Sequence, residues 1–368
     1  MAFGDTVATI DLGRLAKNLD QVKNRIGERP IIAVVKANAY GHGAVAIAKQ
    51  IIKSSRQVAV LGVASLDEGI ILREAGIKAP IFLLTGFSVS LIKDLFAYRL
   101  TPSLFDLSTL SALSRYAKKI DAEMRVHLKV DTGMGRLGIP PHEVLGFLQK
   151  AMDEKITVSG IFSHFAEADL SDLTYAREQL SKLKKIATSL KEKRPSFHLA
   201  NSAAILHFPA ALLDQVRPGL MLYGYSPLQG KKSFDLSPIL TLKSRVISIK
   251  NVPTGTAISY GRTFTTKRET RVAVVGIGYA DGYPRSLSNC GRMIAKGVCV
   301  PVIGRVCMDM TMLDVTKVPE LSVGDFVTVI GEEGREWVWV DELAKKTGTI
   351  SYEILCGLKG NMPRVYVK

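Results

Sequence analysis

Between residues 12 and 230, short apolar runs alternate with longer segments in which apolar residues recur at helical spacing. This alternation constrains the fold strongly, because strands that alternate with helices form parallel sheets. Eight strand–helix units within about 220 residues match a closed (β/α)8 barrel of the TIM type, and an open doubly wound sheet is the alternative. The predicted strands are 31–35, 58–64, 81–84, 101–105, 125–130, 158–163, 197–199 and 215–217. The clearest helical stripe consists of Leu12, Leu15, Leu19, Val22 and Ile26.

The sequence changes in character after Tyr225. Residues 226–238 are rich in Ser, Pro, Gly and Lys, which is typical of a connection. From residue 239 onward, short apolar or alternating runs separated by turn signals predict an all-β domain of about 130 residues. Its predicted elements are strands at 241–250, 270–280, 297–315, 324–331 and 335–340 and a short helix at 342–348. We therefore expect a barrel over 12–230 and a mainly β domain over 231–368, with residues 1–11 pairing into the β domain.

Charge and cysteine content narrow the class of protein. The net charge is +15, but Lys and Arg are spread along the chain, which favours a solvated basic surface over a nucleic-acid site. The four cysteines form no C-x-x-C pair and have no His cluster beside them, so neither a zinc site nor a disulfide framework is expected. The N-terminus lacks a signal-peptide pattern, and no apolar stretch reaches about 18 residues. We expect a cytoplasmic protein without a membrane partner.

Reactive side chains follow the predicted barrel strands, and barrel enzymes build their active sites at the C-terminal ends of their strands. Lys36 comes directly after four apolar residues. Two interpretations remain open for it. It is either a lysine that snorkels at the strand end or a desolvated amine in the barrel mouth. Desolvation lowers the pKa of an amine and suits it to Schiff-base chemistry.

The last two predicted strands are followed by Asn201 and Ser202, and by Arg217 and Gly219. Barrels often bind phosphate with the loops at these positions. A serine can donate its hydroxyl, and a glycine lets the backbone approach a ligand closely. Ordinary turns are the alternative for each pair. A phosphate site and a Schiff-base lysine in one barrel mouth point to pyridoxal 5'-phosphate.

At this point the chain resembles a known family, the alanine racemases. The resemblance is carried by nine motifs in order: AVVKANAYGHG, VHLKVDTGMGRLG, SHFAEAD, ANSAA, VRPG, ISYGRTF, GYADG, GRVCMDM and SYEIL. It extends from Ile10 to the C-terminus. It implies a barrel with a C-terminal β domain, and interconversion of L- and D-alanine by two bases with pyridoxal 5'-phosphate.

The resemblance assigns roles around the cofactor. Lys36 would carry it as an internal aldimine. The phosphate would be held by Tyr40, Ser202, Tyr352 and the backbone at Gly219 and Leu220, with Asn201 in the same wall. For Tyr352, a place in the core of the β domain is the alternative. Arg217 would face the pyridine nitrogen. Because a guanidinium only donates, that nitrogen would stay unprotonated, which weakens the electron sink and suits an enzyme that must avoid transamination.

The resemblance also assigns the groups that handle the substrate. Lys36 would be the base on the D-alanine side and Tyr260 the base on the L-alanine side, with His164 bridging Arg217 to Tyr260. Arg136 and the backbone of Met308 would receive the substrate carboxylate. The supporting residues implied are Lys129, Cys307, Asp309 and Tyr279, and the residues of a substrate corridor are Arg285, Arg305, Asp169 and Ile350. Lys129 would be carbamylated to position Arg136, and a plain ammonium paired with Asp131 is the alternative.

Because Tyr260 and Met308 fall in the β domain and Lys36 and Arg136 in the barrel, the family's head-to-tail pairing implies a homodimer with shared sites. The D-alanine would serve bacterial cell-wall peptidoglycan. The alternatives are a broad-specificity racemase, a related decarboxylase, and a non-catalytic protein that binds pyridoxal phosphate. The decarboxylase would not need a tyrosine base in ISYGRTF, and the non-catalytic proteins resemble only the barrel.

Overall fold

A computed structural model describes residues 6–190, 194–228 and 234–368. The chain divides into two compact units. The barrel unit comprises Ala16–Ala39 and Ala44–Leu236, and the β unit comprises Met1–Leu15, Tyr40–Gly43 and Ser237–Lys368. Residues 1–5 of the segment expected to pair into the β domain, and residues 229–233 of the expected connection, lie outside the described residues.

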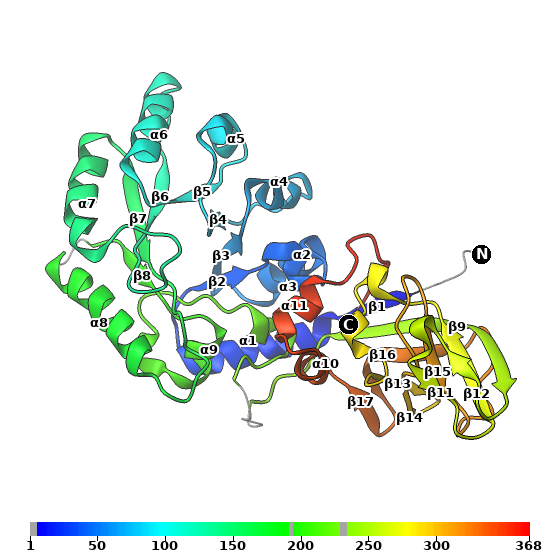
Figure 1. The fold of residues 1–368 in the computed structure, drawn as a ribbon. Helices are drawn as coiled ribbons and strands as arrows, with labels where there is room; N and C mark the ends of the chain where they lie inside the picture. Colours follow the sequence, from blue (N-terminus) through cyan, green and yellow to red (C-terminus); the bar gives the residue numbers. More distant parts are fainter. Residues whose placement is uncertain (1–5, 191–193, 229–233) are drawn as a thin grey trace. The chain divides into compact units, whose positions relative to one another are not determined.

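The barrel unit is built on a parallel sheet whose strands follow one another in chain order, from β2 to β8. These strands are β2 (Ile31–Val34), β3 (Val58–Val63), β4 (Ile81–Leu83), β5 (Thr101–Leu104), β6 (Arg125–Lys129), β7 (Thr157–Phe162) and β8 (Ser196–His198). Figure 1 shows helices outside these strands. The helices in this part of the chain are α1 (Leu12–Ile26), α2 (Lys36–Tyr40), α3 (Ala44–Ser54), α4 (Leu66–Glu74), α5 (Ile92–Ala97), α6 (Leu107–Lys119), α7 (Val144–Asp153), α8 (Thr174–Ser189) and α9 (Ser202–His207).

The run at 215–217, predicted as the eighth strand, is not a strand. Gln215 forms an isolated parallel bridge to His198, and Val216 forms one to Ile31. These two bridges link β8 back to β2 and close the ring. The run stops there because Pro218 has no N–H with which to continue the ladder; its carbonyl accepts from the Val34 N–H at 3.0 Å. The predicted (β/α)8 barrel is confirmed, with a closing segment shorter than expected.

Local sequence explains the elements of the barrel unit. The four residues of β2 are all buried, as expected of a strand with a covered sheet face on each side. On α1, the stripe residues Leu15, Leu19, Val22 and Ile26 are at most 1% exposed. Burying a side chain of this kind stabilises the fold by about 1.5–3 kcal/mol. Asp106 caps α6 by accepting the Thr109 N–H at 2.7 Å.

The β unit holds the remaining strands. They are β1 (Val7–Asp11), β9 (Leu240–Val252), β10 (Ala257–Ile258), β11 (Phe264–Thr265), β12 (Thr270–Val275), β13 (Arg292–Ala295), β14 (Val298–Pro301), β15 (Thr311–Asp314), β16 (Phe326–Glu333), β17 (Glu336–Val338) and β18 (Arg364–Val367). The main path of the sheet runs β14-β13-β16-β9-β1-β18. In it, β1 pairs antiparallel with β9 and parallel with β18. The unit also contains the helices α10 (Val340–Thr347) and α11 (Ser351–Cys356).

Three predicted strands of the β unit were too long. In the run 270–280, the strand ends at Val275. The run 297–315 contains β14 and β15 with non-strand residues 302–310 between them, and only 336–338 of the run 335–340 is strand. Apolar residues continue through 302–310, but Ile303 and Val306 are buried from a loop, and Val302 forms only an isolated bridge to Leu313. The prediction missed the strands β10, β11, β13 and β18 and the helix α11. In the part of the chain that the structure describes, no helix is long and apolar enough to cross a membrane.

Candidate active site

The C-terminal end of the barrel strands gathers the predicted cations of the site. Lys36 begins α2 two residues beyond β2, Lys129 ends β6, and Arg217 follows the bridge residue Val216. Burial, followed by the charges of Arg217, Arg136 and Lys36, lowers the pKa of Lys129 to about 8, against an opposing effect of Asp131. Four cations therefore share one electrostatic environment, which an anionic ligand would stabilise.

His164 belongs to the same cluster. It lies two residues beyond β7, and burial together with the charge of Arg217, and then of Arg136, lowers its pKa to about 3. The imidazole is therefore neutral near pH 7. A neutral histidine in this cluster does not add to its positive charge.

Arg217 is buried and almost fully hydrogen-bonded. Its Nη1 donates to His198 Nδ1 at 2.7 Å and to the His198 carbonyl at 2.8 Å. Its Nη2 donates to the carbonyls of Ser163 at 2.6 Å and Leu199 at 3.0 Å. Of the five N–H donors of a guanidinium, these contacts use the four on Nη1 and Nη2, and the Nε–H is the remaining one. Burial lowers the pKa of Arg217 to about 9, so the group keeps its charge at neutral pH.

The residues after β8 that were predicted to bind a phosphate lie close to one another in the structure. Ser202 Oγ accepts from the N–H of Gly219 at 2.9 Å and of Met221 at 3.3 Å. These contacts leave the serine proton available for donation to an anion. Asn201 caps α9, with its Oδ1 accepting the Ala204 N–H at 3.1 Å, and Leu220 begins the next helical turn directly after Gly219. The two segments form one wall built from backbone and a hydroxyl.

The backbone after Lys36 makes a left-handed turn without glycine. Ala37, Asn38, Ala39 and Tyr40 have φ between 51° and 54°. Such a conformation costs about 1–2 kcal/mol per residue for L-amino acids, and strain of this kind gathers at functional sites.

A carboxylate that the sequence did not single out holds this turn. Glu68 accepts the Ala37 N–H at 2.6 Å with Oε1 and the Ala64 N–H at 2.7 Å with Oε2. Asn38 adds a further bond, since its Oδ1 accepts the Ala44 N–H at 2.8 Å. The one signal in the sequence was Ser65 three residues before Glu68, which reads as a helix-capping pattern.

In the β unit, Tyr40 and Tyr352 lie together, with ring centroids 5.8 Å apart. Tyr352 is on α11, and its ring is half-buried against the turn rather than in the core of the sheet. The helix lies so close to the turn that a Cβ on Gly41 would come within 2.3 Å of the Leu355 carbonyl oxygen.

A second set of predicted residues shares one exposed region of the β unit. The N–H groups of Tyr279 and Ala280 donate to the carbonyls of Cys307 and Met308 at 3.1 and 2.9 Å. Tyr279 is 43% exposed and Met308 54% exposed, and Asp309 next to it is exposed as well.

Tyr260 is joined to this region through its neighbour. Ser259 Oγ donates to the Arg305 carbonyl at 2.7 Å and lies 3.5 Å from Cys307 Sγ. Ser259 has a φ of 64° and Arg262 one of 47°, so strained backbone flanks Tyr260. The Tyr260 side chain is 69% exposed.

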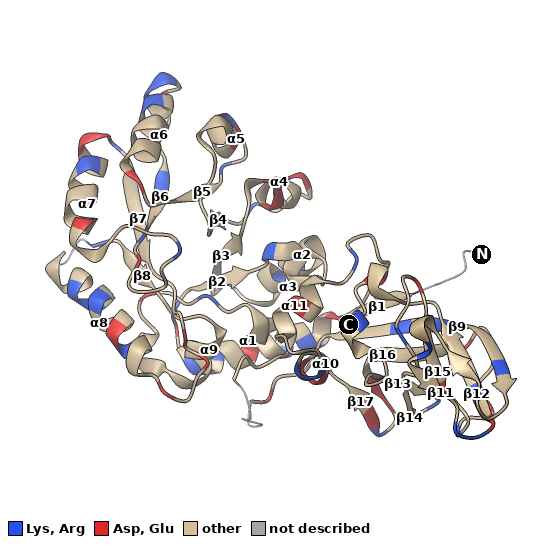
Figure 2. Ribbon diagram, in the orientation of Figure 1, with Lys and Arg blue, Asp and Glu red and all other residues tan. Residues whose placement is uncertain are grey.

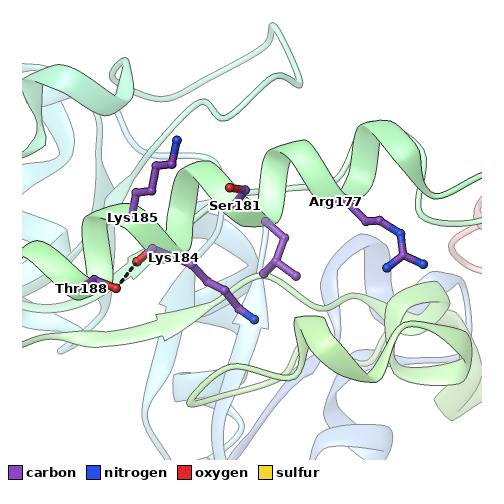
Figure 3. Close-up of a pocket in the computed structure, with 6 residues that line it drawn as sticks. Arg177, Ser181, Lys184, Lys185 and Thr188 are labelled. Carbon is purple, nitrogen blue, oxygen red and sulfur yellow. Dashed lines mark hydrogen bonds between the residues drawn. The ribbon is translucent and has the colours of Figure 1, made fainter.

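Another feature of the barrel unit lies apart from the predicted site residues. Figure 2 shows Lys and Arg along α8. A pocket of about 470 Å³ beside this helix is lined by Arg177, Leu180, Ser181, Lys184, Lys185 and Thr188. Figure 3 shows these residues on α8. None of the predicted site residues lines it.

The comparisons with known proteins agree with this arrangement. The family model for the alanine racemase N-terminal domain matches residues 10–227, and that for the C-terminal domain matches residues 239–366. The chain belongs to the alanine racemase family. The resemblance inferred from the motifs is therefore confirmed.

Individual members of the alanine racemase family match nearly the whole chain. The alanine racemase of Halothermothrix orenii is 44% identical over 98% of this chain and 96% of its own length. A solved alanine racemase structure from Clostridium difficile 630 superposes with a TM-score of 0.92 at 37% identity, covering 99% of this chain and 96% of that chain. One from Bartonella henselae with covalently bound pyridoxal phosphate has a TM-score of 0.89 at 29% identity, covering 99% of each chain.

The side chains of the barrel unit fit pyridoxal 5'-phosphate. Lys36 is an amine at the mouth of the barrel, the Ser202 hydroxyl can donate to a phosphate, and Arg217 keeps one donor for a ring nitrogen. The surrounding cations match the negative charge of the phosphate and of an amino-acid carboxylate.

Proposed function

We propose that this protein is a pyridoxal-phosphate-dependent alanine racemase that interconverts L-alanine and D-alanine. The observation that carries the proposal is the cation cluster of Lys36, Lys129, Arg136 and Arg217 at the barrel mouth of a chain that matches both domain models of this family. We further propose that the enzyme works in the cytoplasm and supplies D-alanine for cell-wall peptidoglycan.

The cofactor would be held by residues from several segments. Lys36 would bind it covalently, Tyr40, Ser202, Tyr352 and the backbone at Gly219 and Leu220 would hold its phosphate, and Asn201 would line the same wall. Arg217 would donate its Nε–H to the ring nitrogen, since its other donors are committed within the barrel. When bound, pyridoxal phosphate acidifies the Cα proton of the attached amino acid.

The chain's own residues would then move that proton. Racemisation requires removal of a proton from one face of Cα and its return on the other, and one base on each face achieves this without turning the substrate. We assign these roles to the Lys36 amine on the D-alanine side and the Tyr260 phenol on the L-alanine side. Arg136 and the Met308 backbone would bind the carboxylate, and His164 would link Arg217 to Tyr260.

Lys129 is proposed to be carbamylated. With a pKa lowered to about 8, about a tenth of its amine is unprotonated at pH 7, and that form attacks carbon dioxide. The nitrogen–carbon bond forms as one C=O π bond of carbon dioxide opens, and the nitrogen releases a second proton to solvent. With the loss of these two protons, the ammonium cation becomes a carbamate anion that can position Arg136. The alternative partner, Asp131, already accepts the N–H groups of Gly133, Met134 and Gly135 with Oδ1.

We also propose a two-fold homodimer in which each site combines Lys36 of one chain with Tyr260 of its partner. The exposure of Tyr260, Tyr279 and Met308 on the β unit supports this arrangement, because large apolar side chains exposed together are typical of an interaction surface. Cys307 and Asp309 would support this part of the site.

Chiral analysis of the products tests the proposed reaction. The purified protein should convert either enantiomer of alanine into the racemate, and activity should rise on addition of pyridoxal phosphate to cofactor-depleted protein. Lys36→Ala should abolish the conversion. If folded, cofactor-loaded protein left both enantiomers unchanged, the proposed function would be wrong.

A further inference from the structure

Inside the barrel, Arg217 is the first member of a buried hydrogen-bonded chain that continues through two histidines. Arg217 Nη1 lies 2.7 Å from His198 Nδ1, and His198 Nε2 lies 2.8 Å from His127 Nδ1. His198 is the last residue of β8 and His127 lies within β6. Strand β7 runs between these two strands (Figure 1). All three side chains are at most 7% exposed.

The direction of each bond follows from the guanidinium. Arg217 can only donate, so His198 Nδ1 must accept and its ring proton must sit on Nε2. Nε2–H then donates to His127 Nδ1, which places the His127 proton on Nε2 as well. Both rings are neutral in this scheme, since a proton on either Nδ1 would set a donor against a donor. Burial and the charge of Arg217 agree, because they lower the pKa of His127 to about 4 and that of His198 further.

The space for His127 depends on a glycine. His127 pairs in register with Gly160 of β7, and a Cβ at position 160 would lie 2.6–2.8 Å from three atoms of the imidazole ring. Any side chain at that position would displace His127 or bend the strand. The glycine at position 160 of β7 therefore leaves the space that the His127 imidazole occupies.

Aromatic side chains pack against the two imidazoles. Phe162 stacks on His198 with centroids 4.9 Å apart and planes 6° from parallel, and Phe82 meets His198 edge-on at 5.8 Å. Phe82 also contacts His127, with centroids 4.4 Å apart. Two apolar side chains would fill this core at a lower desolvation cost, but they would leave one Arg217 donor without its ring acceptor.

We propose that His198 and His127 are positioning residues of the racemase. His198 fixes the orientation of Arg217, and His127, seated over Gly160, locks His198 in the tautomer that Arg217 requires. This inference rests on the proposed function, because the direction of the Arg217 Nε–H matters only if the cofactor ring meets it. A displacement of about 1 Å at a reacting centre can lower a rate by about 100-fold.

Histidine tautomers are measured by ¹⁵N NMR on the cofactor-loaded protein labelled only at histidine. The chain has six histidines, so the spectrum is small enough to assign with single variants. At pH 7, His127 and His198 should each carry one proton, on Nε2. A proton on Nδ1 of His198, or a doubly protonated ring at either position, would overturn the proposal whether or not the protein racemises alanine.

Three variants separate positioning from packing. His127→Phe keeps a ring in the space over Gly160 but removes the acceptor, so His198 should show both tautomers and kcat should fall about 10-fold or more, with little change in KM. Gly160→Ala should give the same signature by displacing His127. Phe82→Leu is the matched control, since it alters packing against both histidines and leaves the hydrogen bonds, and it should keep a single His198 tautomer and a kcat near that of the native protein.

The results that would refute this positioning role differ from those that would refute the proposed racemase function. Equal losses of kcat in His127→Phe and Phe82→Leu, with one His198 tautomer in both, would mean that His127 and His198 only pack the core and do not position Arg217. If His127→Phe does not fold, Gly160→Ala decides the question alone. Native protein with the expected tautomers but without racemase activity would refute the proposed function and leave only the hydrogen-bonded chain.

Discussion

The strongest test of how this fold positions Lys36 is the replacement of Glu68 by Gln. The four left-handed residues after Lys36 store about 4–8 kcal/mol at about 1–2 kcal/mol each. Glu68 opposes that strain with two charge-assisted bonds, at 2.6 Å to the Ala37 N–H and 2.7 Å to the Ala64 N–H. Each such bond contributes about 1.5–3 kcal/mol. Glutamine has one acceptor oxygen, and its NH2 group would face the second N–H.

We therefore expect Glu68→Gln to lower the free energy of unfolding by about 1.5–3 kcal/mol, measured by urea denaturation. Because Lys36 directly precedes the turn, kcat for alanine should fall as well, by up to about 100-fold if the amine shifts by about 1 Å. Asp67→Asn is the matched control, as Asp67 is an exposed carboxylate in the same first turn of α4. If Glu68→Gln matched that control in both measurements, the carboxylate would not be holding the turn.

The other predictions concern the chemistry of the site. Borohydride reduction should fix the cofactor on the peptide that contains Lys36, and an adduct on another lysine would contradict the assignment. Arg217→Glu should let the ring nitrogen protonate, so that racemisation slows, transamination rises and the absorption during turnover changes; a fully active variant with the native spectrum would refute the role of Arg217. The Lys129 pKa is lowered to about 8, so its reactive neutral form increases as pH rises through 8. A ¹³C-bicarbonate NMR signal assigned to carbamate should therefore grow from pH 7 to 9 and be lost in Lys129→Arg, and no signal at any pH would count against carbamylation. In a mixed dimer of Lys36→Ala and Tyr260→Phe chains, one site carries both lesions and the other neither, so activity should recover to about half of native by counting sites; a verified mixed dimer that stayed inactive would rule out shared sites.

Much of the fold followed from local pattern. The alternation of buried runs and helical stripes predicted β2 to β8, because a strand covered on both faces must be apolar throughout. The pattern failed where apolar residues are buried without a ladder. Ile303 and Val306 continue the run of β14 yet lie in a loop. The short helix α11 was missed because six residues show less than two turns of periodicity.

Part of the candidate site was also visible in the sequence. Lys36 could be singled out because a buried charge at the end of an apolar strand is costly, and Arg217 because it follows the last predicted strand, where barrels often bind phosphate. Lys129 was indicated by the resemblance. The structure confirms that these cations interact in one cluster. Tyr352 could be tied to Tyr40 only through resemblance, since nothing in its local sequence distinguishes it from a core aromatic.

The order of the elements, the barrel and the residue types at the ends of its strands could be predicted from the sequence, because they depend on periodicity and on neighbours a few positions apart. Which of those residues contact one another depended on the tertiary structure. Glu68 meets Ala37 across 31 residues and His127 meets His198 across 71. Gly160 makes room for His127 only through the register of β6 and β7. Contacts of this kind depend on strand register and ring closure, and a shift of one residue would turn each side chain to the opposite face of its strand.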